Sequence, residues 1–257
     1  MTKQNRSSSR VAVVTGAAMG IGEAIATRLA EDGHTVVLAD LHLGAAEEAA
    51  RRIASWGWRA EAIGVDVGKP ESIEEAFRTI GERHGRCDIL VNNAGVAKTY
   101  SFMDFPLDNW LLTMNVNVTG AMLCAQHAAR SMVRSEWGRI VNIASVSGLR
   151  ASLGRTAYGT SKAAVMGLTR QMAVELASYG ITANAVAPGP VDTPMTKTLH
   201  SEESRRQYGR AVPAGRYGRP EEIASAVAYL VSDDAAYING HVLPVDGGYV
   251  AAGLMEI

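Results

Sequence analysis

Residues 15–22 read Thr-Gly-Ala-Ala-Met-Gly-Ile-Gly, and they directly follow the apolar, β-branched run Val11–Thr15. This order predicts a strand, a tight turn and the start of a helix. Gly16 permits the turn, Gly20 lets backbone approach a pyrophosphate, and Gly22 allows close packing of helix on strand. The first N–H groups of such a helix attract phosphate. The stretch therefore predicts a dinucleotide-binding turn.

The same alternation of short apolar runs and longer amphipathic segments continues along the chain. Further strands are expected at Thr35–Ala39, Ala60–Val65, Ile89–Val91, Arg139–Ala144, Thr182–Val186 and His241–Val245. Helices are expected at Ile21–Glu31, Gly44–Ser55, Pro70–Arg83, Leu107–Val133, Ala157–Ser178 and Glu221–Val231. Strands that are apolar on both faces imply a parallel sheet covered on both sides. We predict an α/β fold with a Rossmann-type, doubly wound parallel sheet of about seven strands.

The composition and the two ends of the chain narrow its class. No linker or repeat divides residues 10–257, so we expect a single domain after a disordered lead-in at residues 1–9. The net charge is −1 without a long basic run, which argues against nucleic acid as a partner. The polar start and the lack of a long apolar stretch predict a cytoplasmic protein without membrane contact. Neither the two Cys nor the six His show metal-ligand spacing, so no metal is expected.

Asp40 closes the second predicted strand, eighteen residues after Gly22. A carboxylate at this place accepts hydrogen bonds from the adenosine ribose hydroxyls. It would repel a 2′-phosphate, and the following Leu41 and His42 offer no arginine to offset that repulsion. Asp40 therefore favours NAD over NADP, with a role as a helix cap as the alternative.

Tyr158 and Lys162 form a second informative pair. Residues at i and i+4 project from the same face of a helix. An ammonium beside a phenol favours the phenolate, so Tyr158 is a candidate base near neutral pH. Ser145 lies thirteen residues before Tyr158. A lone Tyr-x-x-x-Lys pattern also arises by chance, and its weight depends on the other motifs.

Taken in order, these motifs resemble those of the classical short-chain dehydrogenase/reductases. The resemblance rests on Thr-Gly-x-x-x-Gly-x-Gly, on Asn92-Asn93-Ala94-Gly95, Asn117 and Ser145, on Tyr158-x-x-x-Lys162 and on Pro188-Gly189. It covers about residues 10–249, nearly the whole chain. It implies a hydride-transferring oxidoreductase whose nicotinamide cofactor performs the redox chemistry.

The resemblance also implies catalytic roles. Tyr158 would be the general acid/base, and Ser145 would hydrogen-bond the reacting substrate oxygen. Lys162 would lower the pKa of Tyr158 and bind the nicotinamide ribose. Asn117 would anchor a water that relays protons to Lys162. Asn115 competes with Asn117, and Ser147 competes with Ser145, but only Asn117 and Ser145 match the family's pattern.

Further expected contacts follow the same resemblance. The predicted cofactor-binding residues are Gly16, Met19, Gly20, Ile21, Gly22, Asp40, Leu41, Asp66, Val67, Asn93, Ala94, Gly95, Tyr158, Lys162, Pro188, Gly189, Val191 and Thr193. The predicted substrate-binding residues are Ser145, Ser147, Arg150, Arg155, Tyr158 and Met195. A mobile substrate lid is expected at about residues 193–218, over a pocket for a polar or anionic secondary alcohol.

The leading hypothesis is thus an NAD-dependent dehydrogenase of a secondary alcohol, such as a sugar, polyol or hydroxy acid. An NADPH-dependent ketoreductase resembling the 3-oxoacyl-carrier-protein reductases is the alternative. A nucleotide-binding scaffold without catalysis is a remote third. The helices 107–133 and 157–178 carry more apolar residues than one buried face requires. The family resemblance implies that these helices form a dimer and that the tail Tyr249–Ile257 completes a homotetramer built as a dimer of dimers.

Overall fold

The computed structural model describes residues 9–253 and contains one seven-stranded sheet whose paired strands all run parallel. The strand order is β3-β2-β1-β4-β5-β6-β7, which confirms the predicted doubly wound fold. The predicted lead-in lies almost wholly outside the described residues, as does the end of the predicted tail. The strands are β1 Val11–Thr15, β2 Thr35–Asp40, β3 Arg59–Gly64, β4 Ile89–Asn92, β5 Gly138–Ile143, β6 Ile181–Pro188 and β7 Val242–Val245.

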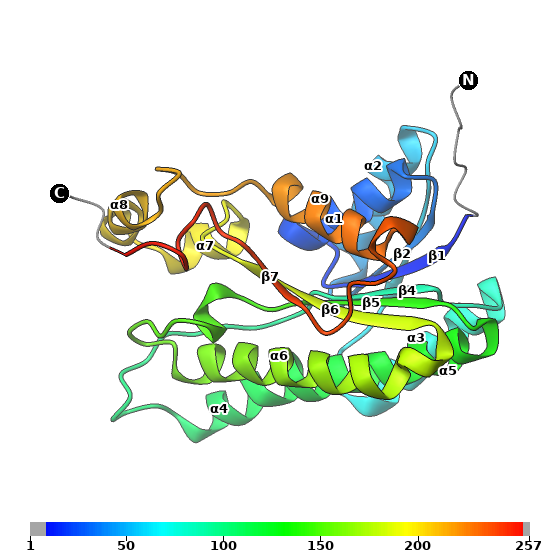
Figure 1. Ribbon diagram of the computed structural model, residues 1–257, viewed down its shortest axis with the longest axis horizontal. Helices are drawn as coiled ribbons and strands as arrows, with labels where there is room; N and C mark the ends of the chain where they lie inside the picture. Colours follow the sequence, from blue (N-terminus) through cyan, green and yellow to red (C-terminus); the bar gives the residue numbers. More distant parts are fainter. Residues whose placement is uncertain (1–8, 254–257) are drawn as a thin grey trace.

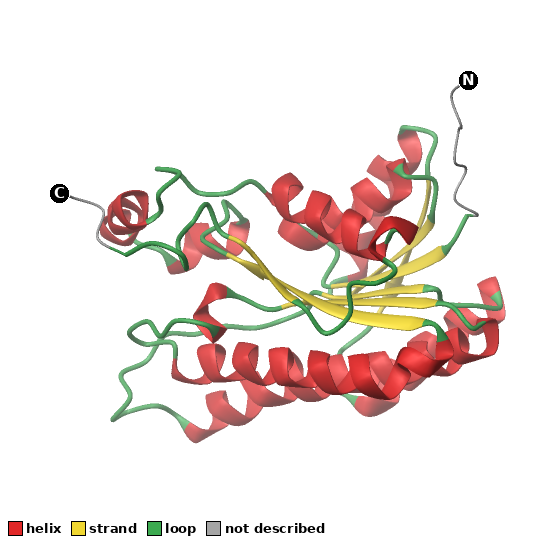
Figure 2. Cartoon of the chain, viewed as in Figure 1, coloured by secondary structure: helices red, strands yellow, loops and turns green. Residues whose placement is uncertain are grey.

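Helices cover both faces of the sheet (Figures 1 and 2). On one face lie α1 Gly20–Glu31, α2 Leu43–Ser55 and α9 Pro220–Val231. On the other face lie α3 Pro70–His84, α4 Leu107–Met114, α5 Ala121–Ser135 and α6 Thr156–Leu176. Each face buries its own apolar cluster against the strands, which is why the strands are apolar on both sides. No helix within residues 9–253 is long and apolar enough to span a membrane.

The predicted long helix over 107–133 is interrupted, which corrects the expectation from the sequence. A π-helical turn, Asn115–Gly120, separates α4 from α5. Gly120 approaches the Val67 carbonyl so closely that a Cβ would not fit, and Asn117 is buried. The extra residue in the turn re-aims Asn117 toward the loop after β4. Helical periodicity does not reveal such an insertion, because the apolar pattern continues on both sides.

Residues 193–218 contain two short helices that the sequence pattern does not predict, α7 Pro194–Leu199 and α8 Glu202–Ala211. The hydroxyl of Thr193 caps α7 and that of Ser201 caps α8. Both helices lack buried residues, so their sequences carry no apolar stripe to signal them. They lie beyond the carboxyl ends of the strands, near the start of α6 (Figure 1).

The sheet has its topological switch between β1 and β4. The chain leaves β1 for β2 and β3 on one side, then returns to pair β4 with the other side of β1. Connections that diverge in this way leave a crevice outside the carboxyl ends of the two strands, where α/β folds bind ligands. The glycine turn after β1 and residues 92–95 after β4 flank this crevice.

Candidate active site

The turn after β1 is a cradle made of backbone. Gly16 and Gly20 have φ values of +63° and +62°, a region that side chains rarely adopt. A Cβ on Gly22 would collide with the Gly16 carbonyl and with Nδ2 of Asn93. In the part of the chain that the structure describes, no side chain caps α1, whose N-cap is Met19. The free N–H groups and positive end of the helix dipole fit a phosphate group.

Asp40 lies at the end of β2, beside this cradle. Its buried carboxylate accepts hydrogen bonds from the backbone N–H groups of Ala18 and His42, both at 2.9 Å. It does not cap α2, whose N-cap is His42, so the helix-cap alternative is wrong. Within residues 9–253, no Lys or Arg pairs with Asp40, and the neighbouring Leu41 is exposed. An added phosphate there would meet an uncompensated negative charge.

The turn after β4 joins the cradle to the catalytic residues. Nδ2 of Asn93 donates to the carbonyls of Thr15 and Gly16, at 2.9 and 2.8 Å, and the Ala94 N–H donates to Oγ1 of Thr15. Gly95 follows, and a Cβ there would lie 3.2 Å from Oδ1 of Asn117 and 3.5 Å from Nζ of Lys162. Close packing therefore explains the small residues of this turn.

Tyr158 and Lys162 share one face of α6, as predicted. Nζ of Lys162 lies 5.6 Å from the centre of the Tyr158 ring and donates to the Ile143 carbonyl, at 2.7 Å, where β5 ends. The ammonium is buried, with no carboxylate beside it among the described residues. Burial disfavours the charged form and lowers the pKa of Lys162 to about 8. Lys162 is therefore a cation poised to exchange a proton near neutral pH.

The pKa of Tyr158 differs from the expectation. Burial raises the pKa of the phenol above its ordinary value, and the nearby Tyr208 adds to the rise. A hydrogen bond from Ser145 and the positive charge of Arg155 oppose it. The pKa of Lys162, about 8, lies below that of the phenol, so Lys162 is already neutral when Tyr158 loses its proton and does not lower the pKa of Tyr158. In this structure the phenol form of Tyr158 is thus favoured, which suits donation of a proton.

Ser145 lies two residues after the end of β5. Its Oγ accepts a hydrogen bond from the Ser147 N–H at 3.1 Å, so it caps the short 3-10 turn Val146–Gly148. The same hydroxyl reaches Tyr158, whereas Ser147 contributes its backbone N–H to the arrangement. The structure therefore places Ser145, and not its competitor, beside the phenol.

Asn117 is buried beside the site and is held on three sides. Its Oδ1 accepts from the Val96 N–H at 2.8 Å, and its Nδ2 donates to the Val96 carbonyl and to Oγ of Ser161. Both amide protons are used, so a bound water would have to donate to the remaining lone pair of Oδ1. Asn115, the alternative, donates instead to the Gly68 carbonyl at 2.7 Å. The role of Asn117 in a proton relay stays a prediction.

The other predicted cofactor contacts lie on the loops along the same edge of the sheet. Asp66 accepts a hydrogen bond from the Gly68 N–H at 2.9 Å, and Val67 packs on the apolar cluster of the α3/α5 face. After β6, Thr193 caps α7, and its side chain lies 3.6 Å from where a Cβ on Gly20 would be. The remaining members of this group are Ile21 in α1, and Pro188, Gly189 and Val191 at and after the end of β6.

Of Arg150, Arg155 and Met195, which are predicted to bind substrate, Arg155 contacts Tyr158. The Arg155 guanidinium carbon lies 5.6 Å from the centre of the Tyr158 ring, so Arg155 is part of the site. Arg150 instead donates to the Tyr249 carbonyl at 2.8 Å. Met195 lies on α7, half exposed. Four aromatic residues that the sequence pattern does not bring together form a cluster: His200, Tyr208, Tyr217 and Tyr249. Tyr208 contacts each of the other three, and His200 contacts Arg155.

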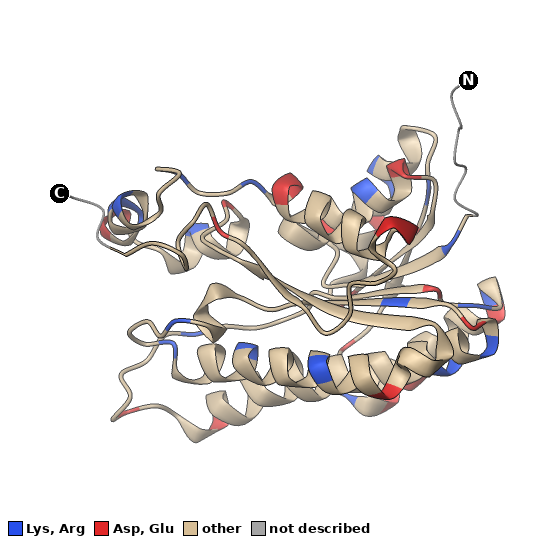
Figure 3. Cartoon of the chain, viewed as in Figure 1, with Lys and Arg blue, Asp and Glu red and all other residues tan. Residues whose placement is uncertain are grey.

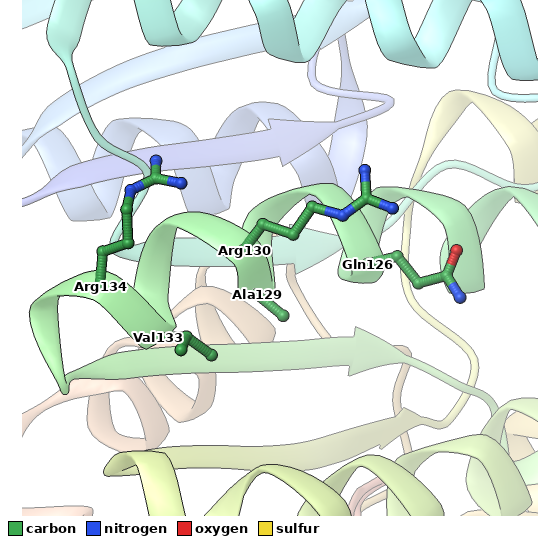
Figure 4. A pocket seen from close by; sticks show the side chains of 5 residues that line it. All are labelled: Gln126, Ala129, Arg130, Val133 and Arg134. Carbon is green, nitrogen blue, oxygen red and sulfur yellow. The ribbon is translucent and has the colours of Figure 1, made fainter.

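A shallow hollow lies on the outer face of α5, outside the candidate active site. It is lined by Gln126, Ala129, Arg130, Val133 and Arg134. Figure 4 shows Arg130 and Arg134 extending from one side of the helix, one turn apart. α5 leads into the amino end of β5, opposite the edge that carries Tyr158. Across residues 9–253, no group of three or more His, Cys, Asp or Glu side chains is arranged to hold a metal ion.

Comparison with known proteins matches nearly the whole chain. Residues 16–250 match a family model described as enoyl-(acyl carrier protein) reductase. The chain is 42% identical to the 3-oxoacyl-[acyl-carrier-protein] reductase FabG of Aquifex aeolicus, over 93% of this chain and 96% of that protein. It is 41% identical to the cis-4-hydroxycyclohexanecarboxylate dehydrogenase of Sinomonas cyclohexanicum, covering 94% and 97%.

A solved structure shows a similar likeness. The gluconate 5-dehydrogenase of Burkholderia cenocepacia, in complex with NADP and tartrate, superposes with a TM-score of 0.91. The two chains are 36% identical, and the superposition covers 95% of this chain and 96% of the other. The likeness therefore extends to the loops at the carboxyl edge, as well as to the sheet.

Proposed function

We propose that this chain, which belongs to the short-chain dehydrogenase/reductase family, transfers hydride between a nicotinamide cofactor and a ketone or secondary alcohol. The observation that carries the proposal is the convergence of Ser145, Tyr158 and Lys162 at the carboxyl edge, next to the glycine cradle. Gly16 and Gly22 pack against neighbouring backbone, whereas the Cβ position of Gly20 has no atom closer than 3.6 Å, which leaves room for a pyrophosphate to approach the turn. When bound, the cofactor supplies or accepts the hydride.

The residues of the chain would handle the proton and the developing charge. Tyr158 would donate its phenolic proton to the substrate oxygen in reduction and take it back in oxidation. Ser145 would donate a hydrogen bond to the same oxygen and stabilise the charge that develops on it. Lys162, whose pKa lies at about 8, would hold the cofactor ribose and return the proton to Tyr158.

For the substrate, the relatives support the ketoreductase alternative over a sugar or polyol. Several proteins that are 35–42% identical to this chain are named 3-oxoacyl-[acyl-carrier-protein] reductases. We therefore propose a ketone placed two carbons from a carboxyl-type group as the substrate class. A hydroxy-acid dehydrogenase is the second candidate, because the Arg155 guanidinium lies beside Tyr158. The dehydrogenase relative also has a carboxylate in its name.

For the cofactor, Asp40 supports NAD(H). Its carboxylate is buried where the adenosine ribose of a bound cofactor would lie in a Rossmann fold, and it is already fixed by Ala18 and His42. A 2′-phosphate at this place would require a compensating cation. The gluconate 5-dehydrogenase structure holds NADP, which supports the opposite choice. Rates measured with both cofactors decide between the two.

The test is a panel of initial rates followed by nicotinamide absorbance. Short 3-oxo acids, their esters, hydroxy acids and polyols would each be assayed with NAD(H) and with NADP(H). We expect turnover of 3-oxo compounds with a preference for NAD(H). Turnover confined to polyols would overturn the substrate class, and a strong NADP(H) preference would overturn the cofactor assignment. Absence of hydride transfer across the panel, with cofactor still bound, would favour the non-catalytic scaffold.

We also propose that the chain forms a homotetramer as a dimer of dimers. The outer faces of α4 and α6 and the loop before α4 expose large apolar side chains: Phe102, Met103, Leu107, Leu111, Leu112 and Val174. A second copy that packs on α4 and α6 would cover these side chains. Light scattering of the purified protein tests this, and a monomer at micromolar concentration would contradict it.

A further inference from the structure

Arg155 is held in place by a neutral partner. Its Nη2 lies 3.0 Å from Nε2 of His200. A guanidinium only donates hydrogen bonds, so Nε2 must accept, and the ring proton must be on Nδ1. Nδ1 lies 3.0 Å from the Tyr217 hydroxyl, which accepts that proton's hydrogen bond. Burial and the charges of Arg155 and Arg205 lower the pKa of His200, which agrees with a neutral ring.

Arg155 therefore keeps its whole positive charge. Within the described chain, no Asp or Glu lies within ion-pair distance of it. The neighbouring Arg205 provides the contrast, because it pairs with Asp192 at 2.9 Å while lying over the Tyr217 ring. Arg155 and Arg205 thus both contact the aromatic cluster of His200 and Tyr217, and of the two only Arg205 is neutralised by a carboxylate of the described chain. A half-buried guanidinium without an anion is a ready site for one.

The surroundings restrict how that guanidinium can move. His200 stacks on Tyr208, with ring centres 5.1 Å apart, and Tyr208 contacts Tyr217 and Tyr249. The three tyrosines come from α8, from the loop before α9 and from the segment after β7, and they meet at Tyr208, on which His200, the partner of Arg155, stacks. Figure 3 shows basic positions on α8 and on the loops beneath it, at the end of the molecule where α6 begins. Packing of this kind pre-organises a binding group.

We propose that Arg155 binds the carboxylate of the substrate, so that the enzyme acts on free oxo or hydroxy acids and discriminates against their esters and thioesters. This rests on the proposed hydride transfer, and it selects free acids in place of the 3-oxoacyl groups on carrier protein after which several relatives are named. A carboxylate matches the planar fork of a guanidinium and would neutralise the free charge. Since Arg155 lies against the Tyr158 ring, the bound carboxylate would be close to the reacting carbon. A ketone or hydroxyl a few bonds from the carboxylate fits this spacing.

The experiment compares an acid with its ester. Wild type, Arg155→Gln and Arg155→Lys would be assayed with 3-oxobutanoate and with methyl 3-oxobutanoate at a saturating concentration of the preferred cofactor. We expect Arg155→Gln to raise KM for the acid about 10–100-fold and KM for the ester less than about 3-fold. Arg155→Lys keeps the charge and loses the fork, so its effect should fall between the two.

Arg206→Gln is the matched control, because Arg206 lies on α8 and pairs with Glu203 on the surface. It should leave both KM values unchanged. Calorimetry with malonate, in the presence of cofactor, gives a second measurement that needs no turnover. Wild type should bind malonate at least about 10-fold more tightly than Arg155→Gln does.

The outcomes separate the two proposals. Equal effects of Arg155→Gln on acid and ester would overturn the carboxylate site, as would a wild type that prefers the ester. If wild type turned over neither compound nor any other member of the panel, the proposed function would fail. Loss of malonate binding in Arg155→Gln would then still support the anion site. Equal malonate affinity in the two proteins would overturn it.

Discussion

The cofactor side of the candidate site is formed mainly by backbone, and the substrate side is formed mainly by side chains. On the cofactor side, backbone and glycine form most of the surface, and the contacts join strand ends that are neighbours in the sheet. On the substrate side, long side chains meet from the loop before α6, from His200 between α7 and α8, from α8 and from the segment after β7. The first arrangement tolerates little change at a few positions. The second allows many sequences, because each contact depends on side chains from separate segments.

This difference suggests where specificity lies. The cofactor is common to many reactions, so the backbone that holds it needs only one shape. The substrate is recognised by charge and stacking that single substitutions alter. Tyr158 lies where the two sides meet, because Ser145 reaches it from β5 and Arg155 from the loop before α6. Substitutions of Tyr158, and then of residues on the cofactor side, test whether cofactor binding and substrate conversion can be altered independently.

The largest effect is expected from Tyr158→Phe. It removes the proton donor and leaves the cradle and the aromatic ring intact. We expect kcat to fall about 10³–10⁴-fold with little change in cofactor affinity, measured by steady-state rates and by cofactor titration. Tyr237→Phe is the control, because Tyr237 is fully exposed. Retained turnover in Tyr158→Phe would disprove its role as acid/base.

Gly22→Ala should disrupt the cofactor side. The added Cβ would displace the Gly16 carbonyl and break the Asn93 hydrogen bonds that join the two turns. We expect the free energy of unfolding to fall by about 1–3 kcal/mol and cofactor affinity to fall at least about 10-fold. Chemical denaturation and cofactor titration measure the two effects.

Gly44→Ala is the matched control for this substitution. Gly44 lies in the first turn of α2, and no atom lies within 4 Å of the place that an added Cβ would take. Alanine there should be neutral or stabilising by up to about 1 kcal/mol. Equal behaviour of the two variants would show that the cradle is not tightly packed and that the two sides of the site tolerate change alike.

The same contrast explains how much of the fold can be predicted from the sequence. Strand β1 and the glycine turn are predicted correctly, because apolar runs and glycine spacing are local signals. The placement of Asp40 beside that turn follows from the same pattern. The π-helical turn at Asn115–Gly120 escapes prediction because apolar residues continue on both sides of it and hide the break in the helix. Helices α7 and α8 escape it because they bury no apolar side chain.

The candidate site divides in the same way. Ser145, Tyr158 and Lys162 can be found because their spacing is regular along a loop and one helix. The contact of Arg155 with His200 cannot, since it joins residues 45 positions apart and His200 lies between two helices that carry no apolar signal. The predicted direction for the pKa of Tyr158 is wrong for a related reason. The spacing shows that Lys162 is near Tyr158, but it does not show that burial dominates the pKa of the phenol.

A third variant, Lys162→Met, tests how much free energy of folding the burial of the Lys162 ammonium costs. The pKa of Lys162 is about 8 in the folded protein, against 10.5 as the ordinary value. Below pH 8 both states hold the proton, and folding carries the full cost of burying the charge. Between about pH 8 and 10.5 the unfolded chain binds more protons, so the stability of the wild type rises with pH.

Lys162→Met removes that cost and loses the hydrogen bond to the Ile143 carbonyl. We expect it to be more stable than wild type by about 2 kcal/mol at pH 7, with an advantage that shrinks as pH rises through about 8–10. Urea denaturation at several pH values measures this. Lys69→Met, at an exposed position, should show no such pH dependence. A constant difference across pH would contradict the buried charge.

The smallest effect is expected from Asp40→Asn, which sharpens the comparison on the cofactor side. Asparagine keeps an oxygen for one of the two backbone N–H groups and removes the negative charge that would repel a 2′-phosphate. We expect the ratio of kcat/KM for NAD(H) over NADP(H) to fall about 10-fold, chiefly through a gain with NADP(H). Asp234→Asn is the control, because Asp234 is exposed on the 3-10 turn after α9 and belongs to no predicted site. An unchanged ratio in Asp40→Asn would mean that backbone shape alone selects the cofactor, and that side-chain charge acts only on the substrate side.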